Sequence, residues 1–132
     1  MRPQKSKNKF TERLPYIDRI VFTIGGFFDG FEKTSVHFSG SQAVLENESL
    51  ITPSDADPSP NAVLPKSRFL ARLSALHIEN WNREYMDLGV LDGEQWELEI
   101  YFSDGHKSLT IHGSNAYPPK FNSLRRLMAV QG

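Results

Sequence analysis

The chain has 132 residues, of which 39% are hydrophobic and 23% charged, with a formal net charge of −1. These values are typical of one globular domain that is large enough to bury a core of its own. The absence of cysteine excludes a disulfide scaffold, thiolate metal ligands and a cysteine nucleophile, and no apolar run approaches the roughly 20 residues of a membrane span.

The N-terminal segment differs in charge from the rest of the chain. Six of the first 19 residues are basic and two are acidic, whereas the remainder carries nine basic and fourteen acidic residues. Residues 1–15 show no hydrophobic periodicity, so we expect a flexible basic arm followed by one domain over residues 16–132. The arm lacks the apolar core of a secretory signal, which predicts a cytoplasmic protein. It is either a solvated tail or a contact for nucleic acid or an acidic partner, and its basic residues are Arg2, Lys5, Lys7, Lys9 and Arg13.

Alternating apolar residues predict the first two strands. Over residues 17–27, Ile20, Phe22 and Ile24 alternate with Arg19, Val21 and Thr23, which predicts a strand. A return strand is predicted over 33–39, with Val36 and Phe38 pointing one way in alternation with His37. Gly40-Ser41 then turns the chain into a weaker third strand over 43–51. The connection at 25–31 matches no phosphate-loop pattern. Its phenylalanines either fold back on the core or form an exposed patch for a partner, and they are Phe27, Phe28 and Phe31.

Prolines at 53, 58 and 60 exclude regular structure from residues 52–61. A helix is predicted over residues 65–77, with Pro65 at an early position and an apolar stripe facing the core. His77 lies at the edge of that stripe, where a partly buried structural histidine is expected. Residues 78–87 fit either a short turn capped by Asn80 or an extended segment along the sheet edge.

The strongest pattern is a second hairpin. Asp104-Gly105 separates two alternating runs and predicts a type I′ turn, in which both central residues have a positive φ. That turn places Trp96 opposite Gly113 and Glu97 opposite His112, so one face is apolar and the other is polar. A final helix follows from Pro119 onward, and its buried stripe is Phe121, Leu124, Leu127 and Met128.

The second half of the chain resembles a group of small uncharacterised bacterial proteins. These proteins carry W-x3-Y, then DG-x-QW, then GSNAYP-x-x-F. The first pattern is met by Trp81 and Tyr85, the second by Asp92, Gly93, Gln95 and Trp96. The third is met by Gly113, Ser114, Asn115, Ala116, Tyr117, Pro118 and Phe121. The resemblance implies a shared fold unit and transfers no chemistry.

The predicted element order is β-β-(β)-α-β-β-α. Two hairpins that are each followed by a helix predict an α+β domain, a single antiparallel sheet of four to five strands with both helices on one face. A split sheet or a small, partly open barrel fits the same order.

Catalytic and metal-binding motifs are incomplete. Glu97 opposite His112 can orient a general base, but such pairs are common on protein surfaces. No nucleophile-elbow serine and no H-x3-H metal motif accompany them. We therefore expect no cofactor and no bound metal, and we keep a small-molecule or metal-dependent enzyme using the Glu97/His112 face only as a second alternative.

The prediction that remains is a non-catalytic protein-interaction module of a small bacterial or phage-borne protein, with no membrane contact. One candidate surface is the phenylalanine loop, and the other is the polar sheet face with Glu97, Glu99, Tyr101 and His112. Homodimerisation through a sheet edge or the loop is compatible with this prediction. The first alternative is a nucleic-acid-associated protein that uses its basic arm, although the acidic body repels phosphate.

Overall fold

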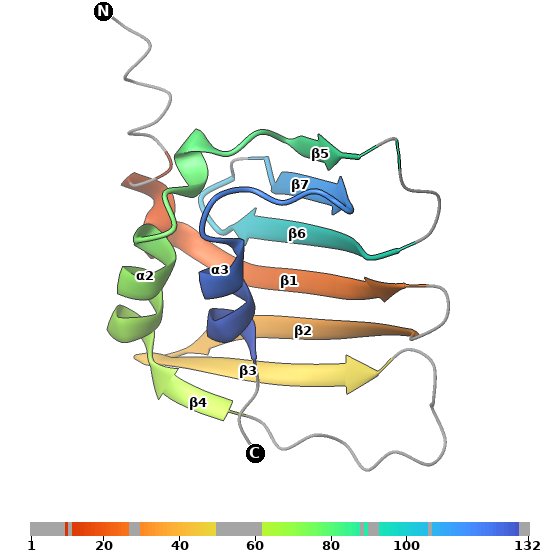
Figure 1. The fold of residues 1–132 in the computed structure, drawn as a ribbon. Coiled ribbons are helices and arrows are strands. Elements are labelled where there is room, and N and C mark those ends of the chain that lie inside the picture. The colour runs from red at the N-terminus through yellow and green to blue at the C-terminus, as the bar shows by residue number, and fades with distance from the viewer. Residues whose placement is uncertain are drawn as a thin grey trace, which may run out of the picture.

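The protein folds around one seven-stranded sheet with two helices on one of its faces (Figure 1). The computed structural model describes residues 10, 12–26, 30–49, 62–87, 89, 93–105 and 107–129. The long strands are β1 (Ile17–Gly26), β2 (Gly30–Ser39), β3 (Gln42–Ser49), β6 (Gln95–Phe102) and β7 (Leu109–Ser114). The short elements are η1 (Leu14–Tyr16), β4 (Ala62–Pro65), η2 (Ile78–Asn80) and β5 (Glu84–Met86), and the helices are α2 (Lys66–Ser74) and α3 (Phe121–Met128).

The α+β class and the placement of the helices are as expected, but the sheet is larger. Its spatial order is β4-β3-β2-β1-β6-β7-β5, so the expectation of four to five strands was wrong. The two missed strands are β4 and β5, which have four and three residues. Runs this short cannot show a period of two. The sheet is also not purely antiparallel, because β5 pairs with β7 in parallel.

The β6–β7 hairpin has the predicted register. Trp96 lies opposite Gly113 and Glu97 opposite His112, and the pairing extends to Ile100 and Leu109. The predicted type I′ turn was wrong, because Gly105 has a φ of 86° whereas Asp104 has no positive φ. The register is therefore held by the burial of the apolar face, which a slip of one residue would turn to solvent.

The β1–β2 hairpin pairs further than expected, through Gly26 and Gly30. The predicted connection over 25–31 therefore shortens to residues 27–29, so Phe27 and Phe28 lie outside the described residues. Phe31 belongs to β2 and is half-buried. A Cβ on Gly25 would collide with the backbone of Gly30 and Phe31, so this position accepts only glycine without a shift of the strand.

Both helices bury the predicted stripes against the sheet. In α2, Phe69 and Leu73 are fully buried, and in α3 the buried residues are Phe121, Leu124, Leu127 and Met128. The start at Pro119 was wrong, because Lys120 takes the left-handed conformation with a φ of 65° and the helix begins after it. His77 is also left-handed and lies beyond α2. Its side chain is 56% exposed, so the expected partial burial was wrong.

The segment between α2 and β6 contains both a short turn and an extended edge strand, but the predicted cap was wrong, because Asn80 is the last residue of η2 and His77 is its N-cap. The short η2 turn comes first, and β5 then runs along the edge beside β7. Trp81, between these elements, is buried in the core.

The core begins earlier than predicted. Phe10 and Leu14 are 8% and 9% exposed and belong to the main hydrophobic cluster. The backbone N–H of Ser103 donates to the carbonyl of Tyr16 at 2.7 Å, which fixes η1 to the end of β6. The expected boundary at residue 15 therefore lies too far along the chain, and the packed domain includes Phe10. None of the described helices is long and apolar enough to cross a membrane.

Candidate interaction site

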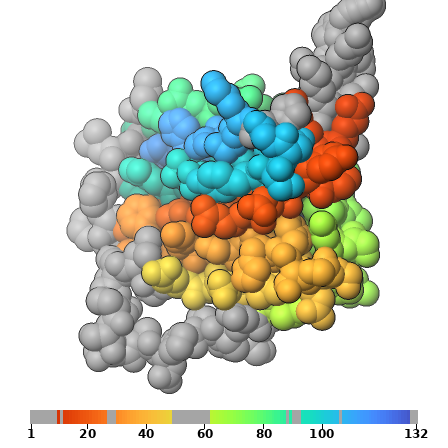
Figure 2. All heavy atoms as spheres, turned by 180° about the vertical axis from the view of Figure 1, so that it is seen from behind, coloured from red at the N-terminus to blue at the C-terminus, as the bar shows by residue number. Residues whose placement is uncertain are grey.

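One face of the sheet is uncovered by helices, and we call it the open face. It is the side seen in Figure 2, where β7, β6, β1 and β2 follow one another across the molecule. Pairing aligns its side chains into rows that cross the strands. The most polar row runs Glu48, Lys33, Thr23, Glu97, His112 and Glu84, from β3 to the edge strand β5.

The open face is acidic. Two permanent cations, Arg19 and Lys33, stand among five glutamates, which are Glu46, Glu48, Glu84, Glu97 and Glu99. Four of these glutamates are exposed and Glu99 is half-buried. None of these five glutamates lies opposite another on a neighbouring strand. Their excess over the two cations makes the face complementary to a positively charged partner.

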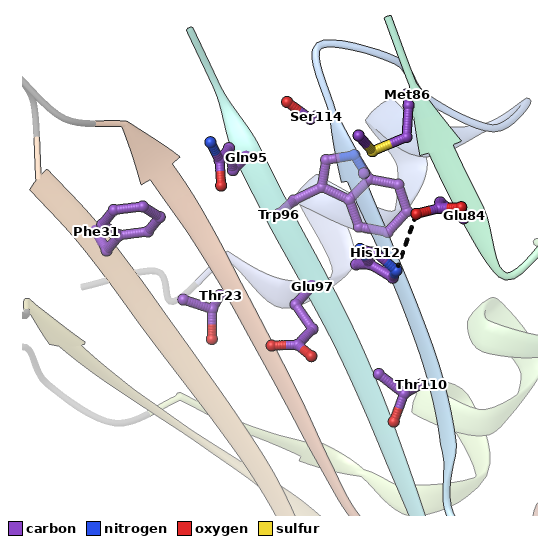
Figure 3. Close-up of a pocket in the computed structure, with 11 residues that line it drawn as sticks. Thr23, Phe31, Glu84, Met86, Gln95, Trp96, Glu97, Thr110, His112 and Ser114 are labelled. Atoms are coloured by element: carbon purple, nitrogen blue, oxygen red, sulfur yellow. Dashed lines mark ion pairs between the residues drawn. The ribbon is translucent and has the colours of Figure 1, made fainter. Parts of the chain in front are cut away.

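A shallow hollow of about 620 Å³ lies on the β5 side of the open face (Figure 3). Phe31 and Met86 stand at opposite sides of it, Glu97 lies between them, and Glu84 is on β5 beside Met86. Met86 is 50% exposed. The hollow thus offers apolar contacts at both sides, one carboxylate in its middle and a second at its β5 edge.

The predicted pair of Glu97 and His112 is only partly realised. The two residues are cross-strand neighbours, but the ion pair of His112 is with Glu84, whose Oε2 lies 3.7 Å from the histidine Nε2. Both partners are more than half exposed. Sequence reasoning missed Glu84 because β5 is too short to be recognised, and without β5 nothing places this residue beside β7.

Tyr101 and Glu99 form a second polar group on the open face. The phenol donates a hydrogen bond to Glu99 Oε2 at 3.0 Å, and the Arg19 guanidinium lies 4.8 Å from the centre of the tyrosine ring. The hydrogen bond to the carboxylate raises the pKa of Tyr101, and Arg19 partly opposes that rise. The predicted surface residues Glu97, Glu99, Tyr101 and His112 therefore do share one face.

Four residues of the bacterial-protein resemblance, Tyr85, Gly113, Ala116 and Phe121, surround Trp96 at one end of the sheet. The indole ring lies 4.7 Å from Phe121 and 6.1 Å from Tyr85, measured between ring centroids. Its N–H donates to the carbonyl of Ala116 at 3.0 Å. A Cβ on Gly113 would collide with the indole, so the glycine is what lets Trp96 lie flat on β7.

The loop after β7 is tied to the start of β6 by polar contacts. Asn115 Oδ1 accepts from the backbone N–H of Glu94 at 2.9 Å, and the Asn115 N–H donates back to the Glu94 carbonyl at 2.9 Å. The Tyr117 hydroxyl donates to Glu94 Oε1 at 2.8 Å. These contacts of the matched residues therefore support the fold of this corner, and Asp92 lies outside the described part.

The phenol of Tyr117 should titrate above the ordinary pH range of a tyrosine. Burial, together with the hydrogen bond to the Glu94 carboxylate, raises the pKa of Tyr117 to about 12. Because the folded state holds this proton more tightly than the unfolded state, the contribution to stability is lost as pH rises from about 10 to about 12. Ultraviolet titration at 295 nm should show a late step that Tyr117→Phe removes. An unchanged titration of the variant would contradict the Glu94 contact.

The described residues contain no group of three or more histidines and carboxylates arranged to hold a metal ion. Of the predicted basic arm, only Arg13 is described, at the start of η1. Comparison of the chain with protein-family models, with curated proteins and with solved structures finds no match in any of the three. Function has therefore to be argued from these surfaces themselves.

Proposed function

We propose that the protein is a non-catalytic protein-interaction module whose open face binds a basic, extended segment of a partner protein. The observation that carries this proposal is the excess of glutamate over lysine and arginine on a broad, uncovered sheet surface. Such a surface raises the rate of encounter with a positively charged partner and disfavours acidic ones.

The hollow on the open face fits the side chain of a lysine or arginine. Neighbouring strands are ~4.8 Å apart, so Glu97 on β6 and Glu84 on β5 flank β7 at a separation of ~10 Å. A long basic side chain can place its methylene groups against Met86 or Phe31 and its charge beside a carboxylate. In an extended segment every second side chain points to the same side. The rows of the open face are also two residues apart along each strand, so a segment lying along the strands can place one side chain over each row.

The catalytic alternative has less support from this geometry. His112 beside a carboxylate is the arrangement of a general base, but its partner Glu84 comes from the sheet edge and both side chains are solvated. A solvated ion pair of this kind is common on protein surfaces. The resemblance to small bacterial proteins, a bacterial or phage-borne origin, a cytoplasmic location and homodimerisation remain predictions.

Removing two charges from the hollow should abolish most of the binding to a basic peptide. The probe is a fluorescein-labelled ten-residue peptide of alternating lysine and threonine, and the measurement is fluorescence anisotropy at low salt. We expect Glu84→Gln with Glu97→Gln to weaken binding at least tenfold, because two desolvated charge contacts are lost. The melting temperature should not change, since both residues are on the surface.

The matched control removes the same net charge elsewhere, by Glu12→Gln with Glu32→Gln. Both residues are exposed, Glu32 lies on the helix side of the sheet, and Glu12 precedes the first strand. Equal losses in the two double variants would show that binding follows net charge alone, and the proposal would then fail.

A further inference from the structure

The two helices carry a charge opposite to that of the open face. Neither α2 nor α3 contains an acidic residue. Together with the residue before α3, they present six cations, which are Lys66, Arg68, Arg72, Lys120, Arg125 and Arg126. All except Lys66 are exposed, so the side of the molecule away from the open face is basic.

Three of these cations converge on a hollow between the helices. This α2–α3 hollow has a volume of about 300 Å³ and no acidic lining residue; it is formed by Arg72, Ala75, Leu76, Lys120, Ser123 and Arg126. Figure 1 shows the two helices next to each other on the sheet.

The hydrogen-bond donors of this hollow are largely unused. Lys120 is held in place by its Nζ, which donates to the carbonyl of Ala75 at 3.0 Å. The guanidinium groups of Arg72 and Arg126 make no ion pair or hydrogen bond with another described residue. Each guanidinium carries five N–H donors in a fork that matches two oxygens of a phosphate, and the Ser123 hydroxyl adds one more donor.

Helix stability alone does not account for this pattern. Cations in the last turn of a helix complement its dipole, which explains Arg72 and Arg126. Arg68 is in the first turn of α2, where a positive charge is unfavourable, and it stands four residues before Arg72. Like charges at this spacing repel each other on the helix surface. The cluster therefore lowers the stability of α2, and a bound anion would restore that stability.

We propose that the α2–α3 hollow binds a backbone phosphate of a nucleic acid, held by Arg72, Arg126 and Ser123, with Arg68 contacting a neighbouring phosphate. Arg125 is outside this site because it shares hollows with the carboxylates of Glu32 and Glu94. The proposal is independent of the partner surface, which is on the other side of the sheet.

A polymer fits better than a single phosphate ion. The cations continue along α2 beyond the hollow, and one phosphate would leave Arg68 without a contact. The η1 turn contacts α2, so the chain enters the domain beside this helix. The sequence before that point adds four cations and no acidic residue within positions 1–9.

The test is fluorescence anisotropy of the full chain with a labelled twelve-nucleotide single strand, from 50 mM to 300 mM salt. We expect Arg72→Gln with Arg126→Gln to weaken binding at least tenfold. Because each lost phosphate contact on a single strand contributes ~0.7 to the slope of log affinity against log salt, the slope should fall by about 1.4. The control, Lys33→Gln with Lys107→Gln, removes the same charge outside the helices and should weaken binding less than threefold.

Three results would overturn the proposal. Equal losses in the two double variants would mean that only net charge matters. If deletion of residues 1–9 abolishes binding and the Arg72 and Arg126 substitutions leave it unchanged, the oligonucleotide binds to the N-terminal segment and not to the α2–α3 hollow. Binding of inorganic phosphate, measured by calorimetry, without binding of the oligonucleotide would make the ligand a free anion.

Discussion

Replacement of Trp96 by alanine should lower the free energy of unfolding by ~3–5 kcal/mol, the usual range for emptying an aromatic core site. The side chain is 3% exposed and contacts Phe121 and Tyr85. Its loss also leaves the Ala116 carbonyl without its indole donor. Since a whole domain is stabilised by ~5–15 kcal/mol, urea denaturation followed by circular dichroism should show a large decrease in the midpoint.

The neighbouring residue provides the control. Glu97 lies next to Trp96 in β6 but on the open face, so Glu97→Gln should change the free energy of unfolding by less than ~0.5 kcal/mol. Trp96→Phe should fall between the two, because it keeps an aromatic ring and loses the hydrogen bond. A cost below ~1 kcal/mol for Trp96→Ala would contradict the packing of this corner.

Deletion of residues 1–14 should destabilise the domain severely. The deletion removes Phe10 and Leu14, which are both in the core. Emptying a phenylalanine site costs ~3–5 kcal/mol and emptying a leucine site ~2–5 kcal/mol. Thermal unfolding followed by circular dichroism should therefore show either a much lower melting temperature or no cooperative transition.

Deletion of residues 1–9 is the matched control, since it removes four basic residues and no described core contact. Its melting temperature should stay within a few degrees of the full chain. The single substitution Leu14→Ala should give an intermediate loss. If both deletions melt alike, near the full-length value, Phe10 and Leu14 contribute nothing and the domain begins later.

The β6–β7 hairpin shows what the sequence can predict. The alternation of Trp96, Leu98 and Ile100 sets one face. The predicted pairs from Trp96–Gly113 to Ile100–Leu109 are confirmed, although the type of turn was wrong. The buried stripe of α3 was equally clear from its helical spacing. In these cases the information is local, because the pattern and the structure extend over the same residues.

Contacts between distant segments could not be predicted in this way. Glu84 lies beside His112 only because a three-residue strand joins the sheet edge, and no pattern of three residues specifies a strand partner. Phe10 and Leu14 stand in a polar segment, where two apolar residues at helical spacing are too few to predict a buried helix. Their burial depends on the η1 turn, which follows from tertiary contacts.

The net charge of the residues after position 19 was also misleading, because it averages over two faces of opposite charge. The sequence beyond residue 19 is acidic, which argued against binding to nucleic acid. The fold separates that charge into a glutamate-rich open face and two helices without acidic residues. The separation depends on strand order and on which helix face is buried, so composition cannot show it.

The partner surface can be tested most directly by residue-resolved nuclear magnetic resonance. The ¹⁵N-labelled protein is titrated with the lysine–threonine peptide, and the amide shifts are followed along the chain. The open face predicts saturable shifts in β5, β6, β7 and β1, centred on Glu84, Glu97 and His112, with the amides of α2 and α3 unchanged. Shifts confined to the helices, or none at saturating peptide, would contradict the assignment of the open face as the partner surface.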